Sequence, residues 1–332
     1  MPQVLAETPP TVTPRVMRAA VITAPGLVEV QQVALREPST NEVRVRVESC
    51  GVCASNVPPW EGRPWFTYPM EPGTLGHEAS GFIDAVGADV AQWKRGDRVA
   101  FLGNNGYAEF EIVPAEGLIA IPPELDGHAF PGEPLGCAMN IFARSAIREG
   151  DVVAIIGIGF LGALLVQLAR HAGARVIAIA RRSFALEIAR ELGAEPVVLG
   201  DPGEVVRRVQ EIAGGRLCDV TIEATGKQAP LSLAAELSRE RGRLVVAGFH
   251  QDGPREVNMQ LWNWRGLDVI NAHEREPAIY LSGMRAALEA VRSGRINPAP
   301  LFTHHFPLES LGEALALTRD RPDGFMKALV TP

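Results

Sequence analysis

The chain has 332 residues, of which 46% are hydrophobic and 21% are charged, and its formal net charge is −7 at pH 7. This length suits about two domains, and the acidic balance argues against nucleic-acid binding. No apolar run reaches the roughly 18 residues of a membrane span, and the four cysteines are too scattered for a disulfide framework. We therefore expect a reduced, cytoplasmic protein that binds neither nucleic acid nor membranes.

The text of the chain changes character along its length. The first 16 residues are rich in proline and lack a secretory signal, which predicts a loose extension. Short β-branched runs broken by Gly and Pro follow, and then strands alternate with helices of about a dozen residues, as in a parallel doubly wound sheet. After about Gly294 the text is strand-like again. We predict an α/β protein with three units. Residues 1–16 form the extension, residues 17–141 and 290–332 form a discontinuous β-rich domain, and residues 142–289 form an inserted α/β domain.

A glycine-rich phrase, G-I-G-F-L-G, spans Gly157 to Gly162. Three glycines at this spacing also occur by chance, but here the phrase follows the apolar strand D-V-V-A-I-I and opens a helix. Gly157 would permit a tight turn, Gly159 would let a pyrophosphate approach, and Gly162 would let helix and strand pack closely. Phe160 and Leu161 would then stand at the helix N-terminus, where free N–H groups bind phosphate. The sequence predicts dinucleotide binding.

The end of the next strand, R-V-I-A-I-A, indicates which dinucleotide. NAD binders usually carry an acidic residue there for the ribose hydroxyls, but this chain has Ala180 followed by Arg181 and Arg182. Two guanidinium groups suit a 2′-phosphate, because each offers a planar fork of donors to phosphate oxygens. Alternatively, these arginines are a solvated helix start. We predict NADP(H) in preference to NAD(H).

Several phrases, in this order, resemble the zinc-dependent medium-chain alcohol and polyol dehydrogenases. They are G-V-C-A-S-N, P-G-T-L-G-H-E-A-S-G, V-G-A-D-V, R-G-D-R-V, Y-A-E-F-E-I-V-P, E-P-L-G-C-A, the glycine-rich unit and F-M-K-A-L-V. The resemblance covers the chain from Met17 to its end. It implies a GroES-like β-rich catalytic domain, a Rossmann domain inserted into it, and an active site between the two.

The resemblance also implies one catalytic zinc ion per chain. Cys53 and His77 match the first two ligands, and Glu78 matches an acidic neighbour that ligates directly or exchanges with substrate and water. For the third ligand, alcohol-type members have a cysteine where Cys137 stands and polyol-type members a glutamate where Glu133 stands. On a helical turn both would share a face, so either could reach the metal. Zinc with three protein ligands keeps one position open and acts there as a Lewis acid on an alcohol or carbonyl oxygen.

Other implied positions carry matches and departures. Ser55 matches the hydroxyl that passes the alcohol proton outward, and Thr225 and Gly226 stand where the family lines the nicotinamide pocket. We expect Gly248, which ends the strand R-L-V-V-A-G, to contact the cofactor as well. Asn56 replaces the carboxylate that usually orients the zinc-binding histidine, and an amide is a weaker substitute. The four-cysteine structural zinc lobe is missing, so at most one zinc ion is expected.

Five residues are candidates for substrate contact: Asn56, Trp60, Trp65, Asn104 and His273. The two tryptophans follow the phrase G-V-C-A-S-N, in a segment that borders the substrate cleft in the family. Core packing is an equally good explanation for them. His273 follows the strand L-D-V-I-N-A, where a histidine is more often polar filler than a ligand.

The predicted function is zinc-dependent, NADP(H)-linked oxidation and reduction of a secondary alcohol and its ketone, with a polyol, sugar or cyclitol favoured. The family suggests a homodimer or homotetramer. One alternative is a zinc-free enone or quinone reductase of the same fold, whose members lack the Cys and His-Glu ligands. Another is a redox-inactive NADP(H)-binding protein. Metal analysis and a broad hydride-transfer assay separate the three.

Overall fold

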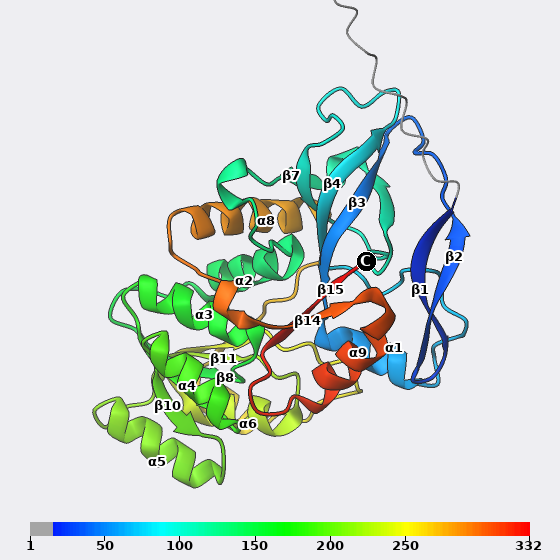
Figure 1. The fold of residues 1–332 in the computed structure, drawn as a ribbon. Coiled ribbons are helices and arrows are strands. Elements are labelled where there is room, and N and C mark those ends of the chain that lie inside the picture. Colours follow the sequence, from blue (N-terminus) through cyan, green and yellow to red (C-terminus); the bar gives the residue numbers. More distant parts are fainter. Residues whose placement is uncertain (1–15) are drawn as a thin grey trace, which may run out of the picture.

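The computed structural model describes residues 16–332, which form a two-stranded, a seven-stranded and a six-stranded sheet (Figure 1). The predicted extension lies outside these residues except for Val16, which begins the first strand. Within the described part of the chain, no helix is long and apolar enough to cross a membrane. The α/β architecture with a parallel sheet and a separate β-rich unit is confirmed.

The β-rich unit is assembled from both ends of the chain. Its larger sheet has the order β14-β15-β3-β4-β5-β7, with β6 paired to β3, and β1 and β2 form an antiparallel ribbon. The strands are β1 (Val16–Ala24), β2 (Leu27–Ala34), β3 (Glu42–Gly51), β4 (Ala79–Val86), β5 (Arg98–Phe101), β6 (Phe110–Pro114), β7 (Leu118–Ala120), β14 (Phe302–Pro307) and β15 (Lys327–Thr331). Helices α1 (Val57–Glu61) and α9 (Leu311–Asp320) pack on each other, and α9 also packs on β15.

The six-stranded sheet has the order β10-β9-β8-β11-β12-β13, and all its neighbours are parallel. Its strands are β8 (Val152–Ile156), β9 (Arg175–Ala180), β10 (Glu195–Val198), β11 (Cys218–Glu223), β12 (Ser238–Val246) and β13 (Asp268–Asn271). The helices of this unit are α3 (Phe160–His171), α4 (Ser183–Glu191), α5 (Pro202–Ile212), α6 (Gln228–Leu237) and α7 (Met259–Arg265). The strand order reverses between β8 and β11, the point at which such sheets bind dinucleotides beyond their carboxyl ends.

Strand β8 shows why the sequence forms a doubly covered sheet. All five of its residues are buried, because helices cover both faces and successive side chains point to opposite sides. Val153 and Ile155 join a core with residues of α3, whereas Val152, Ala154 and Ile156 join a core with residues of α5 and α6.

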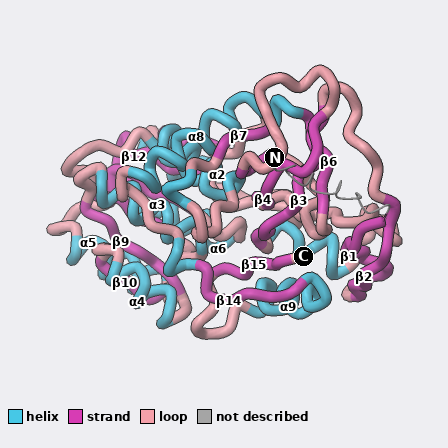
Figure 2. Tube along the Cα trace, turned by 45° about the horizontal axis from the view of Figure 1, so that its top comes forward, coloured by secondary structure: helices cyan, strands magenta, loops and turns pink. Residues whose placement is uncertain are grey.

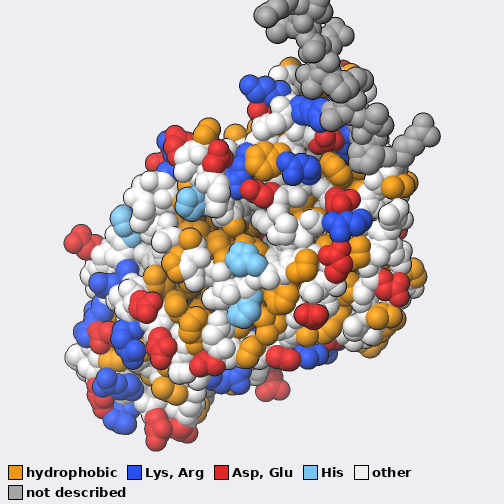
Figure 3. Space-filling view, in the orientation of Figure 1, with side chains coloured by type: hydrophobic (Ala, Val, Ile, Leu, Met, Phe, Trp, Pro, Cys, Tyr) orange, Lys and Arg blue, Asp and Glu red, His pale blue; other side chains and the backbone are white. Residues whose placement is uncertain are grey.

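Two helices connect the units. α2 (Gly132–Ser145) and α8 (Pro277–Arg292) pack against each other, and the two predicted domain boundaries fall inside them. The core on this side of the parallel sheet continues into the β-rich unit through Ala100, Ile119 and Met326. Figure 2 shows α5 and the β1–β2 ribbon at opposite ends of the molecule. On the face in Figure 3, positive and negative side chains are interspersed.

Candidate active site

Cys53, His77 and Glu78 meet where two neighbouring strands end and begin. β3 ends at Gly51 and β4 begins at Ala79, and the strands pair antiparallel. The ligand atoms of the three side chains lie within 4.8 Å of one another. A Cβ at Gly51 would lie 2.0 Å from Oε2 of Glu78, so glycine is required beside this carboxylate. Thiol, imidazole and carboxylate are the ligands that zinc takes in proteins, so the donor set fits that metal.

The raised pKa of His77 indicates that this group of side chains carries excess negative charge. Burial disfavours the charged imidazole, but a hydrogen bond to Cys53 and nearby negative charges outweigh it and raise the pKa of His77 to about 10. The charges belong to Cys53, Glu133 and Glu78. Surroundings that hold a proton on histidine far above neutrality carry excess negative charge, which favours a divalent cation.

Helix α2 brings Glu133 and Cys137 to the same place. They stand one turn apart, and Sγ of Cys137 donates to Oε1 of Glu133 at 3.2 Å. Burial raises the pKa of Glu133 and the charge of His77 lowers it. Burial and the charge of Glu133 raise the pKa of Cys137, whose thiol also contacts the hydroxyl of Tyr280 from α8. The predicted shared face is confirmed, and Tyr280 is a neighbour that the sequence did not reveal.

Lys327, the first residue of β15, joins this group to the parallel sheet. Its buried Nζ forms an ion pair with Glu78 and donates to the carbonyl of Val52 at 3.1 Å. The same Nζ lies 5.1 Å from the ring centre of Phe160. Burial lowers the pKa of Lys327, but the charges of Glu78, Cys53 and Glu133 together outweigh burial and raise it, so the ammonium stays charged. In the sequence, this buried lysine could have been recognised as the single charged residue of the apolar phrase F-M-K-A-L-V.

Ser55 and Asn56 lie in the short 3-10 turn after Cys53. Oγ of the half-buried Ser55 donates to Oδ1 of Asn56 at 3.4 Å. Asn56 is 1% exposed, and its Nδ2 donates to the carbonyl of Leu75 at 3.0 Å and to the hydroxyl of Tyr107 at 2.7 Å. Both N–H groups are therefore used inside the protein, where they fasten the loop that leads to β4.

Glu111 of β6 is a buried carboxylate that the sequence analysis did not select. Its Oε1 accepts the backbone N–H groups of Asn104 and Asn105, each at 2.8 Å. Its Oε2 has no hydrogen-bond partner among residues 16–332. Burial raises the pKa of Glu111 to about 7, against the two N–H groups and the charge of His77, which lower it. The carboxylate of Glu111 therefore interacts electrostatically with His77, which belongs to the group of Cys53, His77 and Glu78, called the metal group below.

The glycine-rich turn has the shape that a bound phosphate needs. Gly157 has φ of +100°, and a Cβ there would lie 2.5 Å from a side chain of the loop after β11. A Cβ at Gly162 would lie 2.2 Å from the carbonyl oxygen of Gly157. Gly159 faces open space, directly before α3 begins at Phe160, and no side chain caps that helix. Leu161 packs on the core. The open glycine and the free N–H groups fit a pyrophosphate.

At the end of β9 the two predicted arginines differ. Ala180 is the last residue of the strand, and no acidic side chain follows it locally. Arg182 is half-buried and its Nη1 donates to the carbonyls of Phe325 and, at 3.4 Å, Pro322. Burial lowers its pKa. Arg181 is exposed. Arg182 therefore holds a segment of the β-rich unit, and Arg181 is the guanidinium open to solvent.

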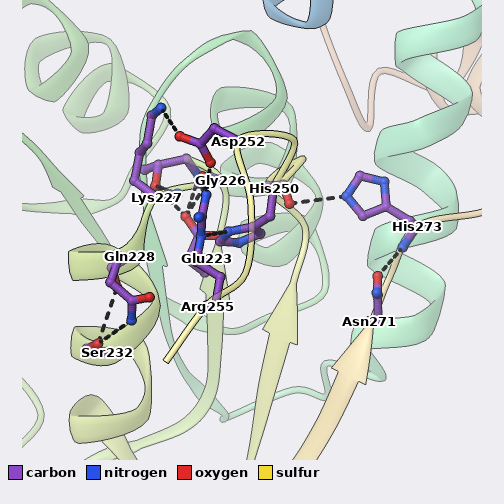
Figure 4. Close-up of polar contacts among 12 residues, drawn as sticks. Glu223, Gly226, Lys227, Gln228, Ser232, His250, Asp252, Arg255, Asn271 and His273 are labelled. Carbon is purple, nitrogen blue, oxygen red and sulfur yellow. Dashed lines mark hydrogen bonds and ion pairs between the residues drawn. The ribbon is translucent and has the colours of Figure 1, made fainter. Parts of the chain in front are cut away.

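The loops after β11 and β12 are cross-linked by a fully buried carboxylate (Figure 4). Oε1 of Glu223 accepts the backbone N–H groups of Thr225 and Gly226 at 2.6 and 2.9 Å. Its Oε2 lies 2.9 Å from Nε2 of His250, whose Nδ1 accepts from Nε of Arg255 at 2.7 Å. This chain of polar contacts holds Thr225 and Gly226 at the carboxyl edge of the sheet.

Gly248 lies beside this edge. A Cβ on it would lie 2.1 Å from the backbone nitrogen of Gly226, so the two loops touch through glycines. Nε2 of His273 lies 3.1 Å from the carbonyl of Gly248 (Figure 4), and its ring centre lies 5.4 Å from that of Phe249. His273 is exposed, so its ring borders the carboxyl edge.

The remaining substrate candidates are spread out. Trp60 is 6% exposed and packs in the core of the β-rich unit, with the guanidinium of Arg319 5.4 Å from its ring. Trp65 is 63% exposed and contacts Phe66. Asn104 is exposed and its backbone serves the buried carboxylate of β6. Of these three, Trp65 and Asn104 present side chains to solvent.

Two protein-family models match the chain. Residues 39–123 match "Alcohol dehydrogenase GroES-like domain", and residues 161–285 match "Zinc-binding dehydrogenase". Sorbitol dehydrogenase from Gallus gallus is 30% identical, over 91% of this chain and 93% of that protein. Sorbitol dehydrogenase from Homo sapiens is 29% identical, over 89% and 90%.

The solved structures that are similar to this chain are also dehydrogenases. A candidate zinc-binding dehydrogenase from Sinorhizobium meliloti 1021 bound to NADP has a TM-score of 0.81 and 28% identity, over 96% of this chain and 99% of that one. An alcohol dehydrogenase from Thermus sp. ATN1 has a TM-score of 0.80 and 28% identity, over 95% and 99%. Galactitol-1-phosphate dehydrogenase from Escherichia coli has a TM-score of 0.81 and 25% identity, over 95% and 100%.

Proposed function

Because the chain belongs to the medium-chain dehydrogenase/reductase superfamily, among its zinc-binding alcohol dehydrogenases, we propose that it interconverts a secondary alcohol and a ketone with zinc and NADP(H). Its class as an NAD(P)-dependent alcohol or polyol dehydrogenase follows from that membership. The zinc dependence, the choice of NADP(H) and the substrate are the parts that we propose.

The observation that carries the proposal is the contact made by Lys327. Its ammonium group touches Glu78 of the metal group and the ring of Phe160, which begins the helix of the glycine-rich turn. A metal-bound reactant and a dinucleotide must meet for hydride transfer, since reacting atoms need to come within about 3–3.5 Å. One side chain that contacts both half-sites supports their use in one reaction.

We assign the metal to Cys53, His77 and a carboxylate from Glu78 or Glu133. Glu133 is favoured over Cys137 as the helical ligand, because its charge acts on His77. A zinc ion held there would act as a Lewis acid on the alcohol or carbonyl oxygen. Ser55 follows the first ligand closely, and its hydroxyl is the group that we expect to carry the alcohol proton outward.

NADP(H) is proposed because the acid that reads the ribose of NAD has no counterpart after β9. Ala180 stands in its place, and the exposed Arg181 supplies a fork of donors for a 2′-phosphate. The Sinorhizobium meliloti structure holds NADP, which makes the same cofactor reasonable in this fold. The nicotinamide would lie against Thr225, Gly226 and Gly248.

A polyol, sugar or cyclitol is the proposed substrate class. The relatives include sorbitol dehydrogenases, and galactitol-1-phosphate dehydrogenase is a structural neighbour. On this chain, Asn104, His273 and Trp65 carry exposed groups suited to hydroxyls and a ring face. A panel of polyols, cyclitols and aliphatic alcohols, each assayed with NADP⁺ and NAD⁺, would rank the classes.

Replacing Cys53 by serine tests the metal. We expect bound zinc and alcohol oxidation to be lost while the circular dichroism spectrum is kept, because a catalytic site contributes less to folding than a structural one. Zinc content is measured by atomic emission spectroscopy. Cys218→Ala removes a buried thiol from the parallel sheet and should keep both zinc and activity.

The rival functions predict other results. Full enone reduction by a zinc-free enzyme in the presence of a chelator would identify a zinc-free reductase. Tight NADPH binding without turnover of any alcohol or ketone in the panel would identify a redox-inactive binding protein. Unfolding of Cys53→Ser would instead make the metal structural.

A further inference from the structure

A carboxylate from the β-rich unit caps the helix that follows the cofactor-selecting strand. Asp323 lies between α9 and β15, and its Oδ1 accepts the backbone N–H of Phe184 at 3.2 Å. The Oγ of Ser183 donates to the same carboxylate at 3.3 Å. No side chain of α4 itself caps this helix start. The free N–H groups at the start of α4 are thus served by an anion from 140 residues away.

Two arginines lie beside the segment that carries Asp323. Arg182 holds the same segment through the carbonyls of Phe325 and Pro322. Arg321, with φ of +47°, is the C-cap of α9, and Nε of its guanidinium donates to the carbonyl of Thr318 at 3.2 Å. The charge of Arg321 lowers the pKa of Arg182, after burial.

Arg181 belongs to the same cluster. Its charge lowers the pKa of Arg321, for which burial is the larger cause. Three positive charges therefore lie near one another, and the charge of Asp323 acts on one of them, that of Arg182. The donors gathered here are a helix N-terminus, a hydroxyl and guanidinium forks, and together these are the groups that bind phosphate esters in proteins.

We propose that the carboxylate of Asp323 occupies the position of the 2′-phosphate of NADP(H), so that carboxylate and phosphate compete for the same donors. This inference rests on the proposed binding of the dinucleotide at the glycine-rich turn. A phosphate monoester carries a charge of about −1.5 to −2 and three acceptor oxygens, so it can replace one carboxylate held by long, exposed hydrogen bonds. NADH has no such group, and Asp323 would keep its place when NADH binds.

The arrangement makes Asp323 a residue that sets cofactor specificity without being part of the cofactor-binding strand. Displacing the carboxylate of Asp323 costs binding free energy for NADPH but not for NADH. The local acid that NAD binders carry after the second strand is absent, and an acid supplied by the other unit stands at the same helix start.

The test is the dissociation constant of each cofactor for Asp323→Asn, measured by fluorescence titration on the full-length protein. We expect the value for NADPH to fall on the order of tenfold, the scale of one charge-assisted contact, and that for NADH to stay within about twofold. The matched control is Asp320→Asn, which removes the same charge from a carboxylate paired with Arg319. It should leave both constants unchanged.

An equal change for NADPH and NADH, no change for either, or the same gain from Asp320→Asn would overturn the inference. A truncated probe pair, 2′,5′-ADP against 5′-AMP, tests the same position without the nicotinamide, and only 2′,5′-ADP should bind Asp323→Asn more tightly. Circular dichroism of each variant verifies the fold.

Arg181→Gln keeps the two proposals separable. If NADP(H) is the cofactor, this variant should lose roughly tenfold in affinity for NADPH and little for NADH. Unchanged NADPH affinity in Arg181→Gln would contradict the cofactor proposal. The comparison of NADPH with NADH in Asp323→Asn would still decide whether the carboxylate stands where a 2′-phosphate goes.

Discussion

An asparagine stands where the family usually has a carboxylate, and an acidic residue of another segment interacts with His77 instead. Asn56 stands where that acid is expected, but its amide is committed to Leu75 and Tyr107. Glu111 of β6 interacts electrostatically with His77, and its Oε2 has no hydrogen-bond partner among the described residues. We infer that Glu111 takes over the electrostatic support of His77, the histidine proposed to bind the metal.

Glu111→Gln should weaken zinc binding about 10- to 100-fold, the usual loss when a partner of a metal ligand is replaced. The amide keeps the shape and can still accept the N–H groups of Asn104 and Asn105, so the loss reports charge. Competition with a chromophoric chelator measures the affinity.

Glu109→Gln is the matched control for that measurement. Glu109 stands two residues earlier, and its carboxylate pairs with Arg18. It should bind zinc as the wild type does. Wild-type zinc affinity in Glu111→Gln would show that His77 needs no carboxylate.

At the scale of elements, strand β3 leads to Cys53 at one end and carries an ion pair, between Glu42 and Arg36, at the other. Its end delivers Cys53, and its first residue, Glu42, binds the guanidinium of Arg36 at 2.6 and 2.9 Å. The hydrogen bond from Arg36, with the backbone N–H of Ser39, lowers the pKa of Glu42 to about 2. The ion pair therefore ties the entering loop to the start of the strand.

This ion pair predicts a pH dependence of stability. A carboxyl whose pKa is lower in the folded protein stabilises it above the unfolded pKa of about 4.3, and the effect is lost as pH falls from there towards 2. Arg36→Ala should lower the free energy of unfolding by under about 1 kcal/mol at pH 7, since the pair is partly exposed. Urea unfolding at several pH values measures it. A difference that stays constant down to pH 2 would contradict the assignment.

At the scale of the molecule, one edge of the parallel sheet carries an unusual share of exposed apolar groups. β13 is an edge strand, and the exposed hydrophobic residues in and around it are Phe249, Val257, Met259, Trp264 and Val269. Trp264 is 83% exposed. Unpaired edges with apolar neighbours favour association, which supports the proposed homodimer or homotetramer through this edge.

A double variant, Trp264→Glu with Val269→Glu, should convert the oligomer to smaller species, with a dissociation constant raised at least about 30-fold because buried tryptophans dominate interfaces. Sedimentation velocity measures it. The control Val198→Glu alters the other edge strand, β10, where a valine is 66% exposed, and should leave the assembly intact. A monomeric wild type would contradict the proposal.

The sequence by itself determined the features that depend on neighbours along the chain. Alternating and continuous apolar runs predict most strands of the β-rich unit and of the parallel sheet, although not β2, β7 and β10, and the sterics of Gly157 and Gly162 predict the turn before α3. The pair Glu133 and Cys137 was correctly placed on one helical face, because a four-residue spacing fixes that geometry. Helices α5, α7 and α8 were not predicted, and the seven residues of α7 are too few to show a clear helical period.

Only the tertiary structure decided which distant groups meet. The guanidinium of Arg182 donates to carbonyls about 140 residues away, and the carboxylate of Asp323 accepts a backbone N–H at the start of α4. Lys327 reaches Val52 across 275 residues. Such contacts depend on how the two units pack, and a buried charge reveals its partner only when the elements around it are in place. The glycine-rich phrase in its strand–helix context therefore predicted a dinucleotide site, the resemblance to the family implied a zinc site, and packing determined which side chains remain free to serve them.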